Sequence, residues 1–153
     1  MLNLKELRLT RATEADLPWM QQLLQENQLP DSDLPAVVND LMLAYQDSEL
    51  IGIAGIEPYP PYGLLRSFVI TLSFRGQGYG RLLYNHLIAH ASWTGIRELY
   101  LLTTTAESFF LKMGFDRVER QTVPLAIQNT REFSELCPSI AICMKRDALS
   151  LFS

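Results

Sequence analysis

A glycine-rich segment, Arg75-Gly76-Gln77-Gly78-Tyr79-Gly80, directly follows the apolar run of residues 64–74. This order predicts a strand that turns through glycines into a helix over residues 81–90. Glycine adopts positive φ and carries no Cβ, so a backbone built this way can approach a ligand closely. A helix that starts there offers N–H groups without helical acceptors and the positive end of its dipole. We therefore predict a phosphate cradle at this turn.

The glycine spacing separates three classes of phosphate-binding loop. A P-loop requires a Lys and then a Ser or Thr after its last glycine, and no Lys follows here. In a dinucleotide fingerprint counted from Gly76, the third glycine would fall on Arg81. The acid expected about 20 residues on would be Glu98, which precedes the next strand rather than ending it. The pattern that remains is R-x-x-G-x-G over residues 75–80. A plain turn without a ligand is the alternative, although three glycines in five residues make a costly turn.

The length and composition predict a single globular domain over residues 1–153. The chain is 48% hydrophobic and 20% charged, which is typical of soluble proteins. A net charge of −4 without a Lys/Arg cluster argues against a nucleic-acid partner. The first residues lack a signal-peptide pattern, and no apolar run approaches the roughly 20 residues of a membrane span. Two cysteines, Cys137 and Cys143, make no disulfide framework, so we expect a cytoplasmic protein with reduced thiols.

Apolar periodicity predicts an alternation of strands and helices. Thr13 and Asp16 have the spacing of a capping box for a first helix, and Thr104 and Glu107 repeat it for a later one. Pro124 is expected to open a short helix over residues 125–133. Strands are expected at residues 7–12, 41–46, 50–56, 64–70, 99–103 and 140–145. Early strands and late alternation give an α/β fold with an α+β mixed sheet.

This order, with the R-x-x-G-x-G loop about halfway along, resembles the GNAT superfamily of N-acetyltransferases over essentially the whole chain. A narrower resemblance lies mainly in the C-terminal half, and it is to the bacterial arsenic-resistance N-acetyltransferases. The acetyltransferase domain of N-acetylglutamate synthases is similar at a greater distance. The segments that carry this resemblance are 57–59, 64–67, 99–106, Phe109-Phe110, Gly114-Phe115, 130–138 and Met144.

The resemblance implies a GNAT-like acyl-CoA N-acyltransferase fold, with acetyl-CoA as donor, no metal, and a small amino-acid-like amine as acceptor. The amine would attack the thioester directly in a ternary complex. The backbone N–H of Ile70 would stabilise the developing oxyanion, usually the largest contribution in acyl transfer. The pantetheine arm would pair with the backbone of Phe68, Val69 and Ile70. The pyrophosphate would be held by the loop residues Arg75, Gly76, Gln77, Gly78, Tyr79, Gly80 and Arg81.

One departure from the family pattern concerns the general acid. Many members carry a Tyr four residues before the Gly-Phe that ends the late helix, and its hydroxyl protonates the leaving thiolate. This chain has Phe110 there, which has no proton to give. Either water supplies the proton or CoA leaves as a thiolate. A general acid often contributes 10²–10⁴-fold, so the second function class stays open, which is a module that binds acyl-CoA without catalysis.

Glu57 and Arg66 are the candidate residues for chemistry on the acceptor. Glu57 ends an otherwise small or apolar strand, and a carboxylate acting through water can remove a proton from an amine. If the turn at residues 59–63 joins a regular antiparallel pair, Arg66 lies on the same face as Glu57. Arg66 would then hold a substrate carboxylate or a similar oxyanion in two-pronged fashion. The alternative is a structural ion pair between the two, worth little if exposed.

Other candidate ligands have simpler structural explanations. His86 and His90 have a zinc-compatible spacing, but Leu87 stands where the HExxH motif has Glu, and both are expected on the apolar stripe of their helix. Cys143 on a strand is most simply a small core residue. The strand over residues 140–145 is a candidate edge for pairing with a second subunit, which would give a homodimer.

Overall fold

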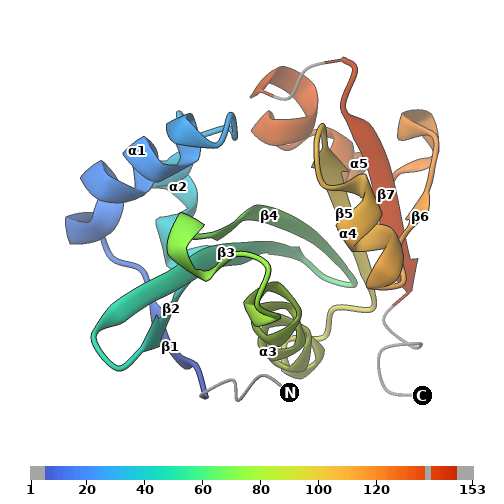
Figure 1. Ribbon diagram of the computed structural model, residues 1–153. Coiled ribbons are helices and arrows are strands. Elements are labelled where there is room, and N and C mark those ends of the chain that lie inside the picture. Colours follow the sequence, from blue (N-terminus) through green and yellow to red (C-terminus); the bar gives the residue numbers. More distant parts are fainter. Residues whose placement is uncertain (1–5, 137–138, 148–153) are drawn as a thin grey trace. The chain divides into compact units, whose positions relative to one another are not determined.

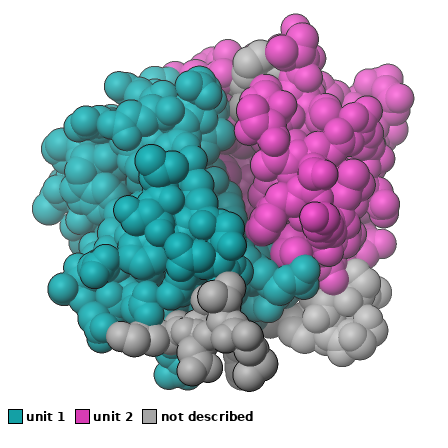
Figure 2. All heavy atoms as spheres, in the orientation of Figure 1, with its two compact units in different colours: residues 1–56, 67–89 teal, residues 57–66, 90–153 magenta. Residues whose placement is uncertain are grey.

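The computed structural model describes residues 6–136 and 139–147 of the 153-residue chain. It divides into two compact units (Figure 2): unit 1 is Met1–Ile56 with Ser67–Ala89, and unit 2 is Glu57–Arg66 with His90–Ser153. Strands β3 (Glu49–Tyr59) and β4 (Tyr62–Ile70) and helix α3 (Tyr79–Trp93) each run from one unit into the other. Across the seven-stranded sheet the strand order is β1-β2-β3-β4-β5-β7-β6, which confirms the expected mixed sheet.

Unit 1 is an antiparallel sheet with helices on both faces. Strand β1 (Arg8–Arg11) pairs with β2 (Leu41–Gln46), and β2 pairs with β3. Helices α1 (Leu17–Glu26) and α2 (Leu34–Val37) lie on one face and α3 lies on the other (Figure 1). The core under α1 and α2 consists of Ala12, Met20, Leu24, Leu34, Val38, Leu41, Leu43, Ile53 and Val69.

The start of α1 follows the predicted capping pattern. The backbone N–H of Thr13 donates to Asp16 Oδ2 at 2.9 Å, and a 3₁₀ turn at Glu14–Asp16 leads into the helix. Pro18 occupies the first turn of α1, where its missing N–H is no loss. The helix therefore begins where local sequence directs it.

Unit 2 is built around strand β5 (Glu98–Thr103). It pairs in parallel with the first part of β4 and antiparallel with β7 (Ile142–Asp147), which in turn pairs with the two-residue strand β6 (Asp116–Arg117). The helices are α4 (Glu107–Lys112), α5 (Leu125–Gln128) and a π-helical turn at Glu132–Leu136. The core of this unit consists of Leu64, Tyr100, Val123, Ile127, Phe133 and Cys143.

Several element predictions need correction. Helix α3 begins at Tyr79 rather than at residue 81, and the segment expected as one helix over residues 125–133 is broken between α5 and the π-helical turn. Thr104 and Glu107 form no capping box, because the Thr103 hydroxyl accepts the Ala106 N–H at 2.9 Å and Glu107 is paired with Arg117. Strand β6 pairs with Met144 and Lys145 on the outer side of β7, so β7 is not the edge strand that was expected, and the homodimer stays a prediction.

Within the described residues, no helix combines the length and the apolar character needed to cross a membrane.

Candidate functional site

Two of the three glycines in the loop of unit 1 have the positive φ that the sequence predicts, whereas Gly80 lies in the first turn of α3. Strand β4 ends at Ile70, and a 3₁₀ turn at Leu72–Phe74 separates it from the loop, so the apolar run is not all strand. Gly76 has φ of 74° and Gly78 has φ of 92°, which side-chain-bearing residues rarely adopt. Glycine is therefore required at these two positions by the path of the chain itself.

The N-terminus of α3 opens directly from this loop. The first helical hydrogen bond runs from the Leu82 N–H to the Gly78 carbonyl at 3.2 Å. Helix geometry leaves the N–H groups before it without a helical acceptor, and the helix is 15 residues long, so its dipole is fully developed. This terminus can bind an anion through backbone groups alone.

The Arg75 side chain holds the loop in place. Its Nε donates to the carbonyl of Ile70 at 2.7 Å and its Nη2 donates to Asn27 Oδ1, just past the end of α1, at 2.8 Å. Gln77 Nε2 donates to the Ser73 carbonyl at 3.0 Å. The side chains of Arg75 and Gln77 thus bind other parts of the chain. The predicted phosphate cradle therefore consists of backbone groups.

Tyr79 is also anchored inward. It is buried, its hydroxyl donates to Gln46 Oε1 at 2.8 Å, and its ring packs edge-on against Phe74 with the ring centres 5.6 Å apart. The Tyr79 side chain therefore fixes the first turn of α3, and what this residue can offer a ligand is its N–H group.

The end of β4 that precedes the loop departs from regular strand geometry. Ser67 has φ of 57°, an uncommon conformation for a residue with a side chain, and it is buried. Beyond it, Val69 packs in the core of unit 1, while Phe68 and Ile70 are half-buried. A Cβ on Gly52 of β3 would lie 2.4 Å from the Val69 carbonyl oxygen, so β3 approaches β4 as closely as glycine permits. The backbone of Phe68, Val69 and Ile70 thus lies in a segment that β3 approaches closely.

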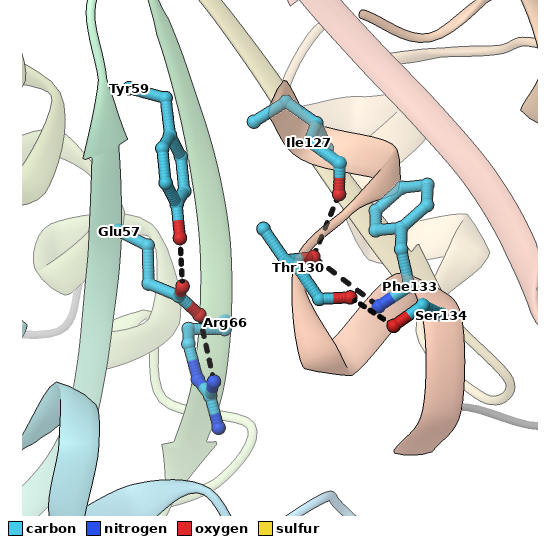
Figure 3. Close-up of polar contacts among 7 residues, drawn as sticks. All are labelled: Glu57, Tyr59, Arg66, Ile127, Thr130, Phe133 and Ser134. Carbon is cyan, nitrogen blue, oxygen red and sulfur yellow. Dashed lines mark hydrogen bonds and ion pairs between the residues drawn. The ribbon is translucent and has the colours of Figure 1, made fainter. Parts of the chain in front are cut away.

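Glu57, Tyr59 and Arg66, here called the Glu57 group, are joined by hydrogen bonds in unit 2 (Figure 3). The Tyr59 hydroxyl donates to Glu57 Oε1 at 2.8 Å, and Arg66 Nη1 donates to Glu57 Oε2 at 2.8 Å. The exposed fraction is 6% for the Glu57 side chain and 0% for that of Arg66, whereas Tyr59 is half-buried. Glu57 and Arg66 do meet on one face, as expected, and they meet as a buried ion pair.

A second polar turn, between α5 and the π-helical turn of unit 2, is shown beside the Glu57 group in Figure 3. The Thr130 hydroxyl donates to the Ile127 carbonyl at 2.7 Å and accepts from the Phe133 N–H at 3.3 Å. The Ser134 hydroxyl donates to the Thr130 carbonyl at 2.8 Å. Both hydroxyls therefore stabilise their own helical turns.

The remaining candidates are a buried phenylalanine, a buried thiol and two histidines of α3. Phe110 is buried, with its ring edge-on to Phe109 and Phe115. Burial raises the pKa of the Cys143 thiol to about 11, so at neutral pH it is a neutral core group, while Cys137 lies outside the described residues. The histidine prediction was wrong in part, because His86 is half-buried and His90 is exposed.

Neither a metal cluster nor a cavity adds to the candidate site within the described residues. Over residues 6–136 and 139–147, no group of three or more His, Cys, Asp or Glu side chains is placed to hold a metal. A surface cavity of 460 Å³ in unit 2 is lined by residues 117–121, 139 and 141–143, none of which is a predicted site residue.

Two contacts of these residues were not predicted from the sequence, the bond from Tyr59 to Glu57 and the bond from Arg75 to Asn27. Tyr59 lies two residues after Glu57 on one strand, so the two share a face, and this alternation was a signal that could have revealed the pair. Asn27 binds Arg75, which lies 48 residues later in the sequence, and no local sequence pattern predicts such a contact.

Comparison with known proteins tests the assignment that the loop suggests. The model of the acetyltransferase (GNAT) family matches residues 2–115. The chain belongs to the GNAT family of acetyltransferases. The resemblance to this family is thereby confirmed, whereas these comparisons do not show the narrower arsenic-resistance subgroup.

Curated GNAT relatives match part of the chain. The amino-acid acetyltransferase of Ralstonia nicotianae is 37% identical over 71 residues, which cover 45% of this chain and 16% of the relative. An uncharacterized N-acetyltransferase of Chlorobaculum tepidum is 31% identical over 91 residues, which cover 59% of this chain and 58% of the relative. The chain thus spans less than two thirds of the length of either protein.

Solved GNAT structures confirm the fold. N-acetylglutamate synthase from Neisseria gonorrhoeae, complexed with coenzyme A and N-acetyl-glutamate, has a TM-score of 0.79 at 18% identity and covers 95% of this chain and 36% of its own. The ribosomal-protein-S18-alanine N-acetyltransferase from Escherichia coli has a TM-score of 0.67 at 18% identity, with 93% and 94% covered. The expected acyl-CoA N-acyltransferase fold is therefore confirmed.

Proposed function

We propose that this protein is an acetyl-CoA-dependent N-acetyltransferase that acts on the amine of a small amino-acid-like acceptor. The observation that carries the proposal is the glycine loop, where positive φ at Gly76 and Gly78 leads into the N-terminus of a 15-residue helix. That arrangement suits the two phosphates of a coenzyme A pyrophosphate. Membership of the GNAT family and a fold shared with an enzyme complexed with coenzyme A support the same ligand.

In this proposal the backbone N–H groups of residues 76–81 hold the pyrophosphate, and Arg75 keeps their loop in shape. The backbone of Phe68, Val69 and Ile70 pairs with the pantetheine arm, and the Ile70 N–H stabilises the oxyanion of the tetrahedral intermediate. The acceptor nitrogen attacks the thioester carbonyl, the new N–C bond forms and the C–S bond breaks. Glu57 is the final acceptor of the proton that the ammonium group loses.

The relatives support the proposed acceptor class. Amino-acid acetyltransferases from three bacteria match 45% to 60% of this chain, and a structural neighbour is complexed with N-acetyl-glutamate. Another neighbour is named for the alanine of a ribosomal protein, so the fold alone does not select the acceptor. Arsenic-containing amino acids belong in the acceptor panel on the strength of the sequence motifs in residues 99–138. We keep the cytoplasmic location as part of the proposal, supported by the low cysteine content.

A second candidate function is an acyl-CoA-binding module without catalysis. The buried, hydroxyl-free Phe110 at the usual acid position favours it, because nothing at that position can protonate a leaving thiolate. Such a module would bind coenzyme A but transfer nothing.

Calorimetry and a thiol-release assay separate these functions. We expect wild-type protein to bind coenzyme A, and to release free thiol from acetyl-CoA only when an acceptor from a panel of amino acids, neutral amines and arsenic-containing amino acids is present. Binding without release for every acceptor would select the second candidate function. Absence of coenzyme A binding would remove both candidates.

A further inference from the structure

The Glu57 carboxylate is covered by its own neighbours. One oxygen accepts the Tyr59 hydroxyl and the other accepts Arg66 Nη1, each at 2.8 Å. Only 6% of the Glu57 side chain and none of the Arg66 side chain is exposed. A proton that comes from outside therefore reaches this carboxylate most directly through a group that already touches it.

Tyr59 is that group. It is the most exposed of the three residues, since it is half-buried while the other two are buried. Its ring packs against the core that includes Ile127 and Phe133, which fixes the ring while its hydroxyl lies on Glu57 Oε1 (Figure 3). A group that can accept and donate a proton, on a residue that is partly exposed, thus lies directly against the buried carboxylate.

The hydroxyls of Thr130 and Ser134, which Figure 3 also shows, do not offer the same route. Each donates its proton to a backbone carbonyl of its own turn, and those bonds are 2.7 and 2.8 Å long. If either hydroxyl passed its proton to another group, its hydrogen bond to the backbone carbonyl would be lost.

We propose that Tyr59 is a catalytic residue that relays the acceptor's proton to Glu57, an inference that rests on the proposed function. The acceptor ammonium gives one proton to the Tyr59 oxygen while the Tyr59 hydroxyl proton passes to Glu57 Oε1. The freed nitrogen lone pair forms the N–C bond, and the C–S bond breaks with its electron pair on sulfur. The second proton lost from nitrogen neutralises that thiolate, so the products are an amide, a free thiol and one proton that leaves Glu57 for water.

This assignment of the two protons also explains how catalysis is compatible with Phe110, which has no hydroxyl. The thiolate receives its proton from the acceptor nitrogen, so the step needs no separate acid at residue 110. The relay thus removes the objection to catalysis that the Phe110 position raises.

The chain contains a matched control for the test. On β5 the Tyr100 hydroxyl donates to Glu98 Oε2 at 3.0 Å, so this pair has the same two-residue spacing and the same kind of bond as Tyr59 with Glu57. Tyr100 is buried in the core of unit 2 and belongs to no proposed site. Tyr100→Phe therefore reports what the loss of such a bond does to the protein in general.

The experiment compares Tyr59→Phe, Tyr100→Phe and wild type on the best acceptor of the panel. Tyr59→Phe is expected to lower kcat about 10²-fold or more, with coenzyme A affinity unchanged by calorimetry, whereas Tyr100→Phe keeps kcat within about threefold. Tyr59→His, whose imidazole can also accept and pass a proton, is expected to recover part of the loss. A Tyr59→Phe variant that stays folded with kcat within about threefold of wild type would overturn the relay.

A double-variant comparison keeps the proposal testable if one single variant folds poorly. Glu57→Gln breaks the relay at its other end, so Glu57→Gln with Tyr59→Phe should be no slower than the slower single variant. Losses that multiply would mean that the two residues act independently, and the relay would be wrong. A wild-type protein that transfers no acetyl group would instead refute the proposed function, which is a separate outcome.

Discussion

At the residue scale, the pairing of Arg66 with Glu57 decides between two interpretations that the sequence leaves open. An exposed pair would contribute little, whereas removing one partner of a buried pair typically costs about 3–5 kcal/mol because a charge is left without compensation. With 0% and 6% of the two side chains exposed, this pair is of the second kind. The geometry favours a structural ion pair over the alternative, a role for Arg66 as substrate anchor.

Arg66→Lys tests that role. Because the guanidinium is bound to Glu57 and carries no exposed surface, we expect the variant to lower kcat/KM by a similar factor of about tenfold for acidic and neutral acceptors alike. The measurement is kcat/KM for glutamate and for a neutral amine in both proteins. A rise in KM confined to glutamate would restore Arg66 as the anchor of the acceptor carboxylate.

Cys143 gives the chain a pH dependence whose sign can be worked out. Burial raises the pKa of its thiol from 9.0 to about 11, so between these values the unfolded chain loses a proton that the folded chain keeps. The stability that the neutral thiol contributes is thus fully present below pH 9.0 and is lost as the pH rises toward about 11. From pH 8 to 10.5, wild type should lose about 2 kcal/mol more unfolding free energy than Cys143→Ala, at about 1.4 kcal/mol per pKa unit.

Urea unfolding at the two pH values measures the difference. Cys137→Ser in both backgrounds leaves Cys143 as the one thiol in the first protein and no thiol in the second. The cavity left by alanine costs the same at both pH values, so it cancels. Equal pH slopes for the two proteins would show that the thiol of Cys143 does not titrate in this range.

At the scale of elements, the strand-to-helix loop was predictable because its cause is local. The requirement for glycine follows from backbone conformation, and Gly76 and Gly78 do take positive φ. The strands followed from apolar runs, since residues buried on both faces of a sheet read as continuous hydrophobic segments. The presence of Glu57 and Arg66 on one face followed from the two-residue period of strands.

What failed at this scale depends on contacts that are distant in sequence. The Thr104–Glu107 pattern was a reasonable cap, but Glu107 is instead paired with Arg117 from β6. Strand β6 has two residues, too few to show a periodicity in the sequence. It forms because its backbone pairs with that of β7. Arg146 donates to the Met113 carbonyl at the end of α4, a contact 33 residues apart that no helix-stop signal encodes.

Gly78→Val tests whether the loop binds coenzyme A through its backbone. Valine at φ of 92° is strained, and its branched Cβ would stand where the phosphates approach, so coenzyme A affinity should fall at least 100-fold. Gly95→Ala is the matched control, because Gly95 also has positive φ, at 82°, but lies in the turn after α3, outside the proposed site. Calorimetry on folded protein should show normal affinity for this control. Equal losses in the two variants would mean that backbone strain alone, and not the cradle, controls binding.

At the scale of the whole molecule, neither compact unit is a continuous piece of chain. The chain passes between them after Ile56, Arg66 and Ala89, and two strands and one helix belong to both. Each unit nevertheless has its own core, with Met20 fully buried in one and Ile127 in the other. Two cores with shared strands raise the question of whether the chain unfolds in one step or in two.

We predict one step, and therefore a single domain in the thermodynamic sense. Unfolding unit 2 would free residues 57–66, which include one end of β3 and one end of β4. The parts of these two strands in unit 1 would then lose the strand segments that continue them. Met20→Ala and Ile127→Ala should each lower stability by about 2–5 kcal/mol, because each empties a site with no exposed surface. Hydrogen exchange of β2 and β5 should then report equal losses of protection in either variant, in the regime where exchange follows global unfolding. If Ile127→Ala weakens β5 and leaves β2 protected as in wild type, the two units unfold separately and the single-domain prediction is wrong.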